Sequence, residues 1–223
     1  MNIFRASLYK AMKNDIESAV KILRNGGVLA VPTDTLYGLA ASAINVDAVE
    51  RIFEIKDRPR DMAMPLLLAG PDDLSQCAVD VPEYAWGLID RFWPGALTLV
   101  LNRSHIVPDI VTAGRETVAL RVPDHPVPRA IARELGGPIT GTSANRNGKS
   151  GIAIAEDVRR ELGDEVDLVV ETDTPLVGVA STVLDLTFSV PTILRAGGVD
   201  IESIRAVCPQ VMPLSESQIE SLR

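Results

Sequence analysis

The chain has 223 residues, of which 46% are hydrophobic, 23% charged and only 4% aromatic, a size and composition typical of one globular domain with an aliphatic core. Its formal net charge of −8 argues against a surface that binds a nucleic-acid backbone without specificity, but leaves room for a local basic pocket. Cys77, Cys208, His105 and His125 are isolated from one another in the sequence, so we expect neither a disulfide framework nor a metal site. The absence of a signal-peptide pattern and of a long apolar run predicts a cytoplasmic protein without a membrane segment.

The predicted elements are helices and strands in turn along the chain. A first helix is expected to begin at a cap formed by Asn14 and to end near Asn25, because Ile16, Val20 and Leu23 form one apolar stripe. The later elements follow from apolar periodicity and from glycine and proline stops. They are, in chain order, a strand over Val28–Val31, an extended segment over Leu39–Ala43, a helix over Asp47–Lys56 capped by Asp47, a strand over Pro65–Ala69, a helix over Pro82–Phe92, a strand over Ala96–Leu101, a loop over Asn102–Glu116, a strand over Thr117–Pro123, a helix over Pro126–Leu135, a polar loop over Gly141–Gly151, a helix over Ala155–Leu162, a strand over Asp167–Glu171, a strand that begins over Ala180–Asp185, one that ends over Pro191–Gly198, and a short helix over Asp200–Val207.

No internal repeat and no linker between domains interrupts this order. The pattern therefore predicts a single α/β domain over residues 1–212, followed by a polar tail over residues 213–223. In an open α/β sheet, ligands bind at the carboxyl ends of the strands. Polar residues that directly follow a strand are therefore candidates for the functional site.

Two segments place polar side chains at such strand ends. Thr33, Asp34 and Thr35 directly follow the first predicted strand, and their hydroxyl and carboxylate groups suit either a ligand site or a turn in which they cap the next element. Arg121 lies near the end of its strand between two apolar residues. Such an arginine either reaches solvent at a sheet edge or points into a pocket.

Lys56 and Arg58 lie at the end of the predicted helix over Asp47–Lys56. Basic residues are favoured there by the helix dipole, so a solvated helix end accounts for them. They also suit a phosphate clamp, because lysine and arginine offer several N–H donors within short reach. The sequence of this segment leaves both interpretations open.

Several common nucleotide and nucleophile motifs are missing. Gly148-Lys149-Ser150 resembles the end of a P-loop, but Ser143 stands where that motif requires its first glycine. The chain contains no G-x-G-x-x-G and no G-x-S-x-G motif. What remains is a distributed set of cations and hydroxyls, which suits a nucleoside triphosphate and a small carboxylate and works by positioning and charge neutralisation. This set is Thr33, Thr35, Lys56, Arg58, Arg121, Ser143, Asn145, Ser181 and Arg195.

Seven short motifs, in this order along the chain, resemble those of the YrdC/TsaC family. They are Pro-Thr-Asp-Thr-x-Tyr-Gly-Leu at 32–39, Lys-x-Arg-Pro at 56–59, Pro-Gly-x-x-Thr at 94–98, Leu-Arg-Val-Pro at 120–123, Thr-Ser-Ala-Asn at 142–145, Ser-Thr-Val-x-Asp at 181–185 and Arg-x-Gly at 195–197. Each motif alone is weak, but seven in sequence over residues 15–200 are specific. The resemblance implies a twisted, open, mixed sheet with helices on its faces.

The resemblance also implies an activity, the formation of threonylcarbamoyl-AMP and pyrophosphate from L-threonine, bicarbonate and ATP. This is the first step of the threonylcarbamoyladenosine modification of tRNA, and the product would pass to downstream transfer proteins. By the same resemblance ATP would contact Lys56, Arg58, Thr117, Ser143, Asn145 and Arg195, whereas threonine would contact Thr33, Thr35, Arg121 and Ser181, with Arg121 on its carboxylate. No residue is expected to act as a covalent nucleophile. Mg²⁺ is expected to arrive with ATP, held by phosphates and water and not by a dedicated protein site.

Two other functions remain as alternatives. One is the carbamoyl-adenylate-forming domain of hydrogenase maturation proteins, whose chains are longer and carry acylphosphatase and zinc-finger modules. The other is a non-catalytic module that binds double-stranded RNA or tRNA. The acidic net charge argues against the second, so direct tRNA binding is expected to be weak.

Overall fold

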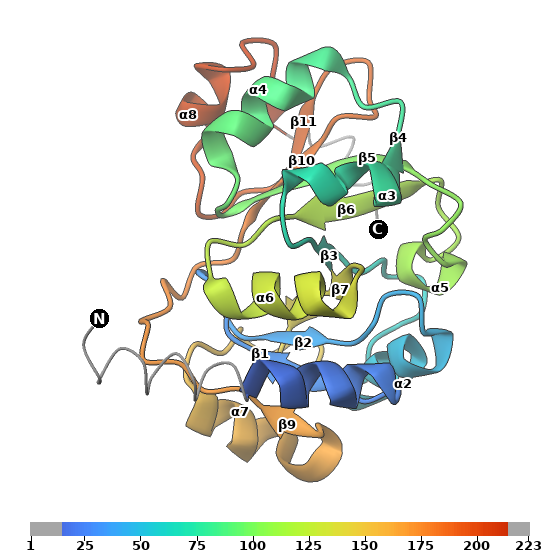
Figure 1. Cartoon of the computed structure of the whole chain (residues 1–223). Helices are drawn as coiled ribbons and strands as arrows, with labels where there is room; N and C mark the ends of the chain where they lie inside the picture. The colour runs from blue at the N-terminus through green and yellow to red at the C-terminus, as the bar shows by residue number, and fades with distance from the viewer. Residues whose placement is uncertain (1–14, 214–223) are drawn as a thin grey trace, which may run out of the picture.

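The structure, a computed structural model, describes residues 15–213 and contains two β-sheets (Figure 1). The smaller sheet has four strands in the order β8 (Thr142–Ser143), β2 (Gly38–Ala40), β1 (Leu29–Val31) and β9 (Leu168–Val169). The larger has eight strands: β12 (Met212–Pro213), β11 (Thr192–Arg195), β10 (Thr182–Asp185), β5 (Leu97–Arg103), β6 (Thr117–Arg121), β3 (Leu66–Leu67) and β7 (Ile139–Thr140) in this order, with β4 (Ala78–Val79) also paired to β5.

Helices separate these strands along the chain. They are a helix over residues 15–24, α2 (Val46–Lys56), α3 (Leu74–Cys77), α4 (Glu83–Phe92), α5 (Asp109–Thr112), α6 (Pro126–Leu135), α7 (Ala155–Leu162) and α8 (Ile201–Arg205), with single 3₁₀ turns at Pro71–Asp73 and Gly163–Glu165. Figure 1 shows the larger sheet in the upper half with α4 and α8 above it, the smaller sheet in the lower half, and α6 between them.

Both sheets are mixed. β1 pairs antiparallel with β2 and parallel with β9, while β5 pairs antiparallel with β6 and parallel with β10. The predicted mixed α/β fold is therefore confirmed, but its strands form two sheets instead of one. The chain passes from the larger to the smaller sheet between Thr140 and Thr142, and an isolated bridge between Ser42 and Ile139 joins the two nearby.

The first helix packs in the way that its apolar stripe predicts. Ile16, Val20 and Leu23 are all buried in one apolar cluster with Val127 and Ile131 of α6. A second, larger cluster fills the space under α2, α4 and the strands of the larger sheet. The predicted cap at Asn14 lies outside the described residues.

Predicted helix bounds are confirmed where glycine and proline mark them. α6 and α7 have the predicted bounds, and Gly136 ends α6 in the left-handed conformation. The predicted cap of α2 was wrong: Asn45, in extended conformation, accepts a hydrogen bond from the N–H of Ala48. Asp47 lies inside the first turn, where its negative carboxylate interacts favourably with the positive end of the helix dipole.

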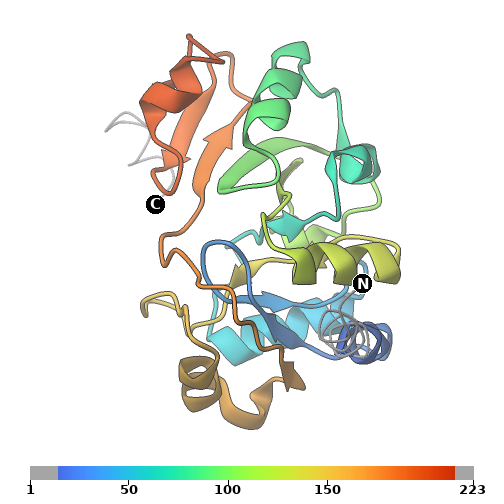
Figure 2. The ribbon, with the colours of Figure 1, turned by 60° about the vertical axis from the view of Figure 1, so that its left-hand side comes forward.

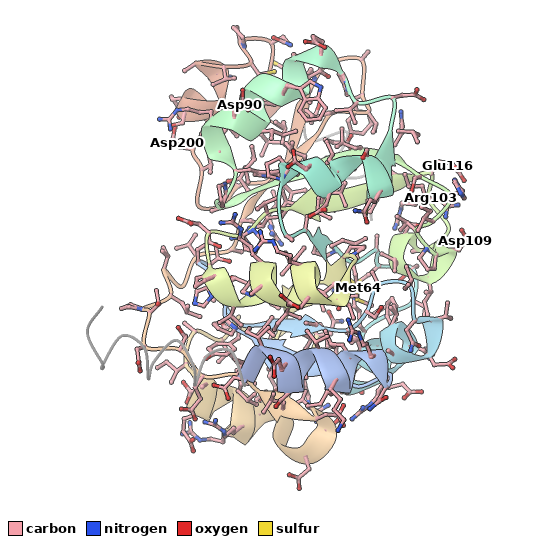
Figure 3. The ribbon with its side chains drawn as sticks, viewed as in Figure 1. Met64, Asp90, Arg103, Asp109, Glu116 and Asp200 are labelled. Carbon is pink, nitrogen blue, oxygen red and sulfur yellow. The ribbon has the colours of Figure 1, made fainter. Side chains whose placement is uncertain are left out.

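Several segments are more ordered than predicted, among them residues 139–143, which form β7 and β8 although a polar loop was expected from Gly141. Residues 70–79, to which no element was assigned, form a 3₁₀ turn, α3 and β4. The expected loop over Asn102–Glu116 contains the end of β5 and the short α5. Arg103 holds this segment: Figure 3 shows it beside Asp109 and Glu116, to which it lies within 2.6 and 3.3 Å. Met212 and Pro213 form the edge strand β12 on β11, while residues 214–223 of the predicted tail lie outside the described part.

Within residues 15–213, none of the helices has the length and apolar character needed to cross a lipid bilayer.

Candidate functional site

A cavity of about 450 Å³ draws its walls from both sheets and from the loop that follows β1. The lining includes Thr98 and Val100 of β5, Ala119 of β6 and Thr142 of β8. Eight of the ten residues predicted to bind ligand line this one cavity: Thr33, Thr35, Arg58, Arg121, Ser143, Asn145, Ser181 and Arg195. Arg121 and Arg195 lie at the carboxyl ends of their strands, as the strand-end argument predicts. Ser181 does not fit that argument, because it directly precedes β10, which runs antiparallel to β11.

The other two predicted residues are not among those that line the cavity. Thr117 lies at the start of β6, on the same strand face as Ala119 and Arg121 but at the opposite end of the strand from Arg121. Lys56 is only 2% exposed and lies behind the cavity wall. The structure therefore brings neither side chain into the cavity.

Arg121 is a buried guanidinium in a fixed position. Its Nε donates to the carbonyl of Gly95 at 2.8 Å, its Nη1 to Oγ1 of Thr35 at 3.0 Å and its Nη2 to Oδ1 of Asp34 at 2.6 Å. Burial lowers the pKa of Arg121, and the charge of Asp34 opposes this shift. Because a guanidinium has five N–H groups and these contacts use three, two stay available for a further acceptor.

The loop after β1 holds the threonine hydroxyls against Arg121. Oγ1 of Thr33 donates to the carbonyl of Leu36 and accepts from the backbone N–H groups of Thr35 and Leu36, as in an ST turn. The hydroxyls of Thr33 and Thr35 lie 2.9 Å apart. Thr33 therefore forms the turn, which was one of the two interpretations of this segment. Thr35 connects that turn to Arg121.

Ser181 and Arg195 form the opposite wall. The hydroxyls of Ser181 and Thr98 lie 2.8 Å apart, and Arg195 donates through Nε and Nη2 to the Ser181 carbonyl at 3.1 and 2.9 Å. This contact requires a close backbone approach, since a Cβ on Gly197 would lie 2.3 Å from the carbonyl oxygen of Ala180. Burial, and then the charge of Arg121, lower the pKa of Arg195, so the two arginines act on each other across the cavity.

The end of α2 is fastened to the polar loop over Gly141–Gly151. Nζ of Lys56 donates to the carbonyls of Ser143 and Asn145, and the carbonyl of Lys56 accepts from the N–H of Asn147 at 2.7 Å. Burial, and then the charge of Arg58, lower the pKa of Lys56 to about 8. Lys56 thus positions the backbone that carries two of the predicted site residues.

Arg58 turns back onto the segment that follows it. Its Nε and Nη2 donate to the carbonyls of Met62 and Ala63 at 3.2 and 2.7 Å, while the side chain lines the cavity. Burial lowers its pKa. A side chain held by two carbonyls beside a cavity does not match the freely solvated helix end that was the alternative.

Asn145 has an unused acceptor. Its Nδ2 donates to the carbonyls of Arg146 and Lys149 at 2.8 and 2.7 Å, which fixes the orientation of the amide. Its Oδ1 is buried and has no hydrogen-bond donor among the described residues. A buried polar atom without a partner costs free energy. A ligand that places an N–H or O–H group here would supply the missing donor.

Every charged side chain that lines the cavity within the described part of the chain is a cation, namely Arg58, Arg121, Lys149 and Arg195. Asp34 offsets part of this charge from behind Arg121. Such a cavity attracts anions and stabilises negative charge on phosphate or carboxylate oxygens. Nowhere in residues 15–213 do three or more His, Cys, Asp and Glu side chains form a group that could hold a metal ion.

A segment over residues 171–181, here called the strap, connects β9 to β10. In Figure 2 it runs in orange from the lower to the upper sheet, beside the blue loop that follows β1. The N–H groups of Val177 and Gly178 donate to the carbonyls of Asp34 and Thr35 at 3.1 and 2.8 Å. Nε2 of His125 lies 3.2 Å from Oγ1 of Thr172. The strap therefore supports, from its outer side, the loop that carries Thr33 and Thr35.

Three contributors to the site were not among the ten residues predicted to bind ligand. Asp34 lies between two predicted residues, but nothing local indicated that it would pair with Arg121. Thr98 was part of a quoted motif without an assigned role, and it contacts Ser181. Lys149 was considered only as part of a failed P-loop motif. For Asp34 the signal present in the sequence was its place directly after a strand, and for Lys149 its place in the polar loop, whereas Thr98 lies at the start of β5.

Comparisons with known proteins point to one family. The Sua5/YciO/YrdC family model, described as "Telomere recombination", matches residues 21–197. The chain is 44% identical to the threonylcarbamoyl-AMP synthase of Bacillus subtilis, over 86% of this chain and 56% of that protein. It is 36% identical to a putative threonylcarbamoyl-AMP synthase of Mycobacterium tuberculosis, over 86% of this chain and 88% of that protein.

A solved structure agrees with these sequence matches. The crystal structure of P. abyssi Sua5 complexed with L-threonine superposes with a TM-score of 0.86 at 38% identity, over 89% of this chain and 58% of that one. The chain thus spans little more than half the length of the first curated relatives it matches.

Proposed function

The chain belongs to the Sua5/YciO/YrdC family, and from this membership we propose that it is an L-threonylcarbamoyladenylate synthase, a nucleotidyltransferase. It would join the amine of L-threonine to the carbon of bicarbonate with loss of water, and would then join the carboxylate oxygen of the resulting carbamate to the α-phosphate of ATP with release of pyrophosphate. This is the first step of the threonylcarbamoyladenosine modification of tRNA. Downstream transfer proteins would take up the product.

The observation that carries this proposal is the charge of the cavity. All four charged side chains that line it in the described residues are cations, and they come from four separate segments of the chain. ATP, bicarbonate and the threonine carboxylate are all anions. Fixed cations supply the stabilisation that transfer of an adenylyl group needs when no covalent nucleophile takes part.

The threonine subsite is assigned to Arg121 and Thr35 on one wall and to Ser181 on the facing wall, with Thr33 behind Thr35. Two N–H groups of Arg121 are available for a carboxylate, which favours two-pronged binding. The nearby hydroxyls of Thr35 and Ser181 offer partners for the hydroxyl and amine of threonine. The P. abyssi relative was solved with L-threonine, which supports this choice of substrate.

The ATP subsite is assigned to Arg58, Ser143, Asn145 and Arg195. Oδ1 of Asn145 would accept from a hydroxyl or amino group of the nucleotide. Lys56 contributes through the loop that it holds and through its charge, and not by lining the cavity. Thr117 is left out of this subsite, because it lies beyond the cavity.

Mg²⁺ would enter with ATP, coordinated by phosphate oxygens and water. Such binding needs few protein ligands, since Mg²⁺ keeps much of its water shell. The donor set fits a metal carried in this way, because the cavity presents hydroxyls, an amide and cations in place of carboxylates. When bound, the ion would neutralise charge on the leaving pyrophosphate.

The test is a pyrophosphate-release assay with single omissions. ATP, L-threonine and bicarbonate together should release pyrophosphate and yield a product with the mass of threonylcarbamoyl-AMP. Omission of any one substrate should abolish both signals. Release of orthophosphate, or equal turnover with carbamoyl phosphate in place of bicarbonate and threonine, would refute the proposal and favour the carbamoyl-adenylate alternative.

A further inference from the structure

We propose that Lys149 is a further binding residue for the polyphosphate of the nucleotide, and that Glu161 of α7 competes with the ligand for it. The proposal rests on the proposed function, since it deepens the ATP subsite. Lys149 lines the cavity, and its Nζ lies 2.7 Å from Oε1 of Glu161. The pair therefore stands at the cavity wall and not on a remote surface.

The backbone of Lys149 is fixed while its side chain is not. Its N–H donates to the carbonyl of Arg146 at 3.1 Å, and its carbonyl accepts from Nδ2 of Asn145 at 2.7 Å. The side chain is 58% exposed and forms an ion pair with Glu161. A lysine on a fixed base with a flexible stem can turn from one anionic partner to another.

Glu161 can release Lys149 at little cost. Nε of Arg146 lies 4.0 Å from the same Oε1, so the carboxylate keeps a cation when Lys149 leaves. Arg146 is itself anchored by the carbonyl of Ile55 at 2.9 Å. Ion pairs that are open to solvent contribute little stability. A polyphosphate carries several charges and offers Lys149 the stronger partner.

The position of Lys149 also indicates which part of the nucleotide it contacts. Arg58 and Asn145 line the same cavity. Of the cations that line it in the described part of the chain, only Lys149 and Arg195 are exposed, and Arg195 is held by the carbonyl of Ser181. The terminal phosphates hold most of the charge of ATP and interact favourably with water. We therefore assign Lys149 to these phosphates and not to the nucleoside.

The experiment compares Lys149→Ala, Glu161→Gln and the double variant by titration calorimetry with ATP, AMP and inorganic tripolyphosphate. Lys149→Ala should weaken ATP and tripolyphosphate binding about five- to tenfold, as expected for one charge-assisted contact, and leave AMP binding nearly unchanged. Glu161→Gln should strengthen ATP binding about threefold, because it removes the competitor. In the Lys149→Ala background this gain should disappear.

Glu156→Gln is the matched control, because it removes the same charge from α7 without touching Lys149; Glu156 lies 3.7 Å from Arg159 instead. If Glu156→Gln strengthens ATP binding as much as Glu161→Gln does, the effect comes only from the change in net charge, and the proposal is overturned. Weaker ATP binding by Glu161→Gln would also overturn it, because the pair would then serve only to hold the loop. Equal losses for ATP and AMP in Lys149→Ala would overturn the assignment to the terminal phosphates.

The two proposals fail in different ways. If wild-type protein binds ATP and releases pyrophosphate while both substitutions leave ATP binding unchanged, the role of Lys149 is refuted and the proposed activity stands. If wild-type protein binds ATP with the expected response to Lys149→Ala but forms no threonylcarbamoyl-AMP, the polyphosphate site stands and the proposed activity fails. Circular dichroism melts of each variant verify folding.

Discussion

At the scale of single residues, Arg121 shows how a buried charge is kept for binding. A charge that is only 6% exposed is costly unless it is paired and hydrogen-bonded. Asp34 provides the opposite charge, and Gly95 and Thr35 accept from two further N–H groups. The guanidinium is therefore already oriented, so a ligand carboxylate would not have to pay for ordering it.

Arg121→Lys is the sharpest single test of the threonine subsite. An ammonium group cannot reproduce the planar contacts to three partners and still offer two parallel donors to a carboxylate. We expect the Kd for threonine to rise at least about tenfold, which corresponds to the loss of roughly 1.5–3 kcal/mol for a charge-assisted contact. ATP affinity should stay nearly constant. Titration calorimetry with each ligand measures both.

Arg129→Lys is the control for Arg121→Lys. Arg129 lies on α6 outside the cavity, and its Nε donates to the carbonyl of Ala69 at 3.0 Å. Arg129→Lys should lower the free energy of unfolding slightly and leave the affinities for threonine and ATP unchanged. Wild-type threonine affinity in Arg121→Lys would show that Arg121 does not hold the carboxylate. Loss of both ligands together would instead indicate a folding defect.

Lys56 gives a pH-dependent prediction. Its pKa of about 8 lies below the ordinary lysine value of 10.5 because of burial and the charge of Arg58. Phosphate bound to Arg58 would offset that repulsion and raise the pKa of Lys56. The complex would then hold a proton that the free protein loses above pH 8, so ATP affinity should fall as pH rises from about 8 to 9.

Calorimetry in buffers of different ionisation enthalpy measures this proton uptake directly. Wild-type protein should take up a fraction of a proton on binding ATP near pH 8.5, and Lys56→Met should not. The variant should also lose the fall in affinity above pH 8. Equal proton uptake in both proteins would mean that another group titrates and that Lys56 does not sense the nucleotide.

At the scale of elements, the strap determines how firmly the loop that carries Thr33 and Thr35 is held. Two of its N–H groups bond to the loop after β1, and Thr172 contacts His125 in the segment after β6. Gly178 makes one of these bonds with a φ of +79°, a conformation that costs other residues free energy. Val177 beside it is 72% exposed, so packing does not hold this part of the strap.

Gly178→Ala should therefore weaken threonine binding. No heavy atom lies within 4 Å of the added Cβ, so the cost is backbone strain, roughly 1 kcal/mol, and not a clash. Gly114→Ala is matched, with a φ of +73° and equally open space, but lies outside the cavity lining. Both should lower Tm by a similar amount, but only Gly178→Ala should raise the threonine Kd. Equal threonine Kd values in the two variants would exclude a role of the strap in binding.

At the scale of the whole molecule, charge separates the proposed enzyme from an RNA-binding module. The formal net charge is −8, and the four cations of the cavity are surrounded by a surface that is acidic on average. Binding driven by phosphate contacts weakens steeply with salt, in proportion to the number of phosphates neutralised. Without ATP, we expect weak tRNA binding with a shallow dependence on salt.

Filter binding or fluorescence anisotropy between 50 and 200 mM salt tests this expectation, over a range in which a protein with many phosphate contacts loses about 10³-fold or more in affinity. Tight binding with such a slope would support the RNA-binding alternative. A flat, weak isotherm together with pyrophosphate release would support the enzyme.

The sequence by itself determined the elements whose ends carry strong local signals, and eight of the residues that line the cavity. α6 runs from Pro126 to the residue before Gly136 as predicted, since proline favours the first turn and glycine the left-handed stop. The seven motifs selected these eight residues, and the rule that ligands bind at the carboxyl ends of strands agrees for Arg121 and Arg195 but not for Ser181. Local chemistry was sufficient for these points, because neighbouring residues fix them.

Only the tertiary structure decided which side chains meet. The pair of Asp34 and Arg121 and the contact of Lys56 with the carbonyl of Asn145 join segments that are 87 and 89 positions apart. The division of the strands into two sheets, and the competition of Glu161 for Lys149, depend on the same pairing of distant strands and loops. The energy of such contacts arises when distant segments pack together, and no local pattern of residues specifies it.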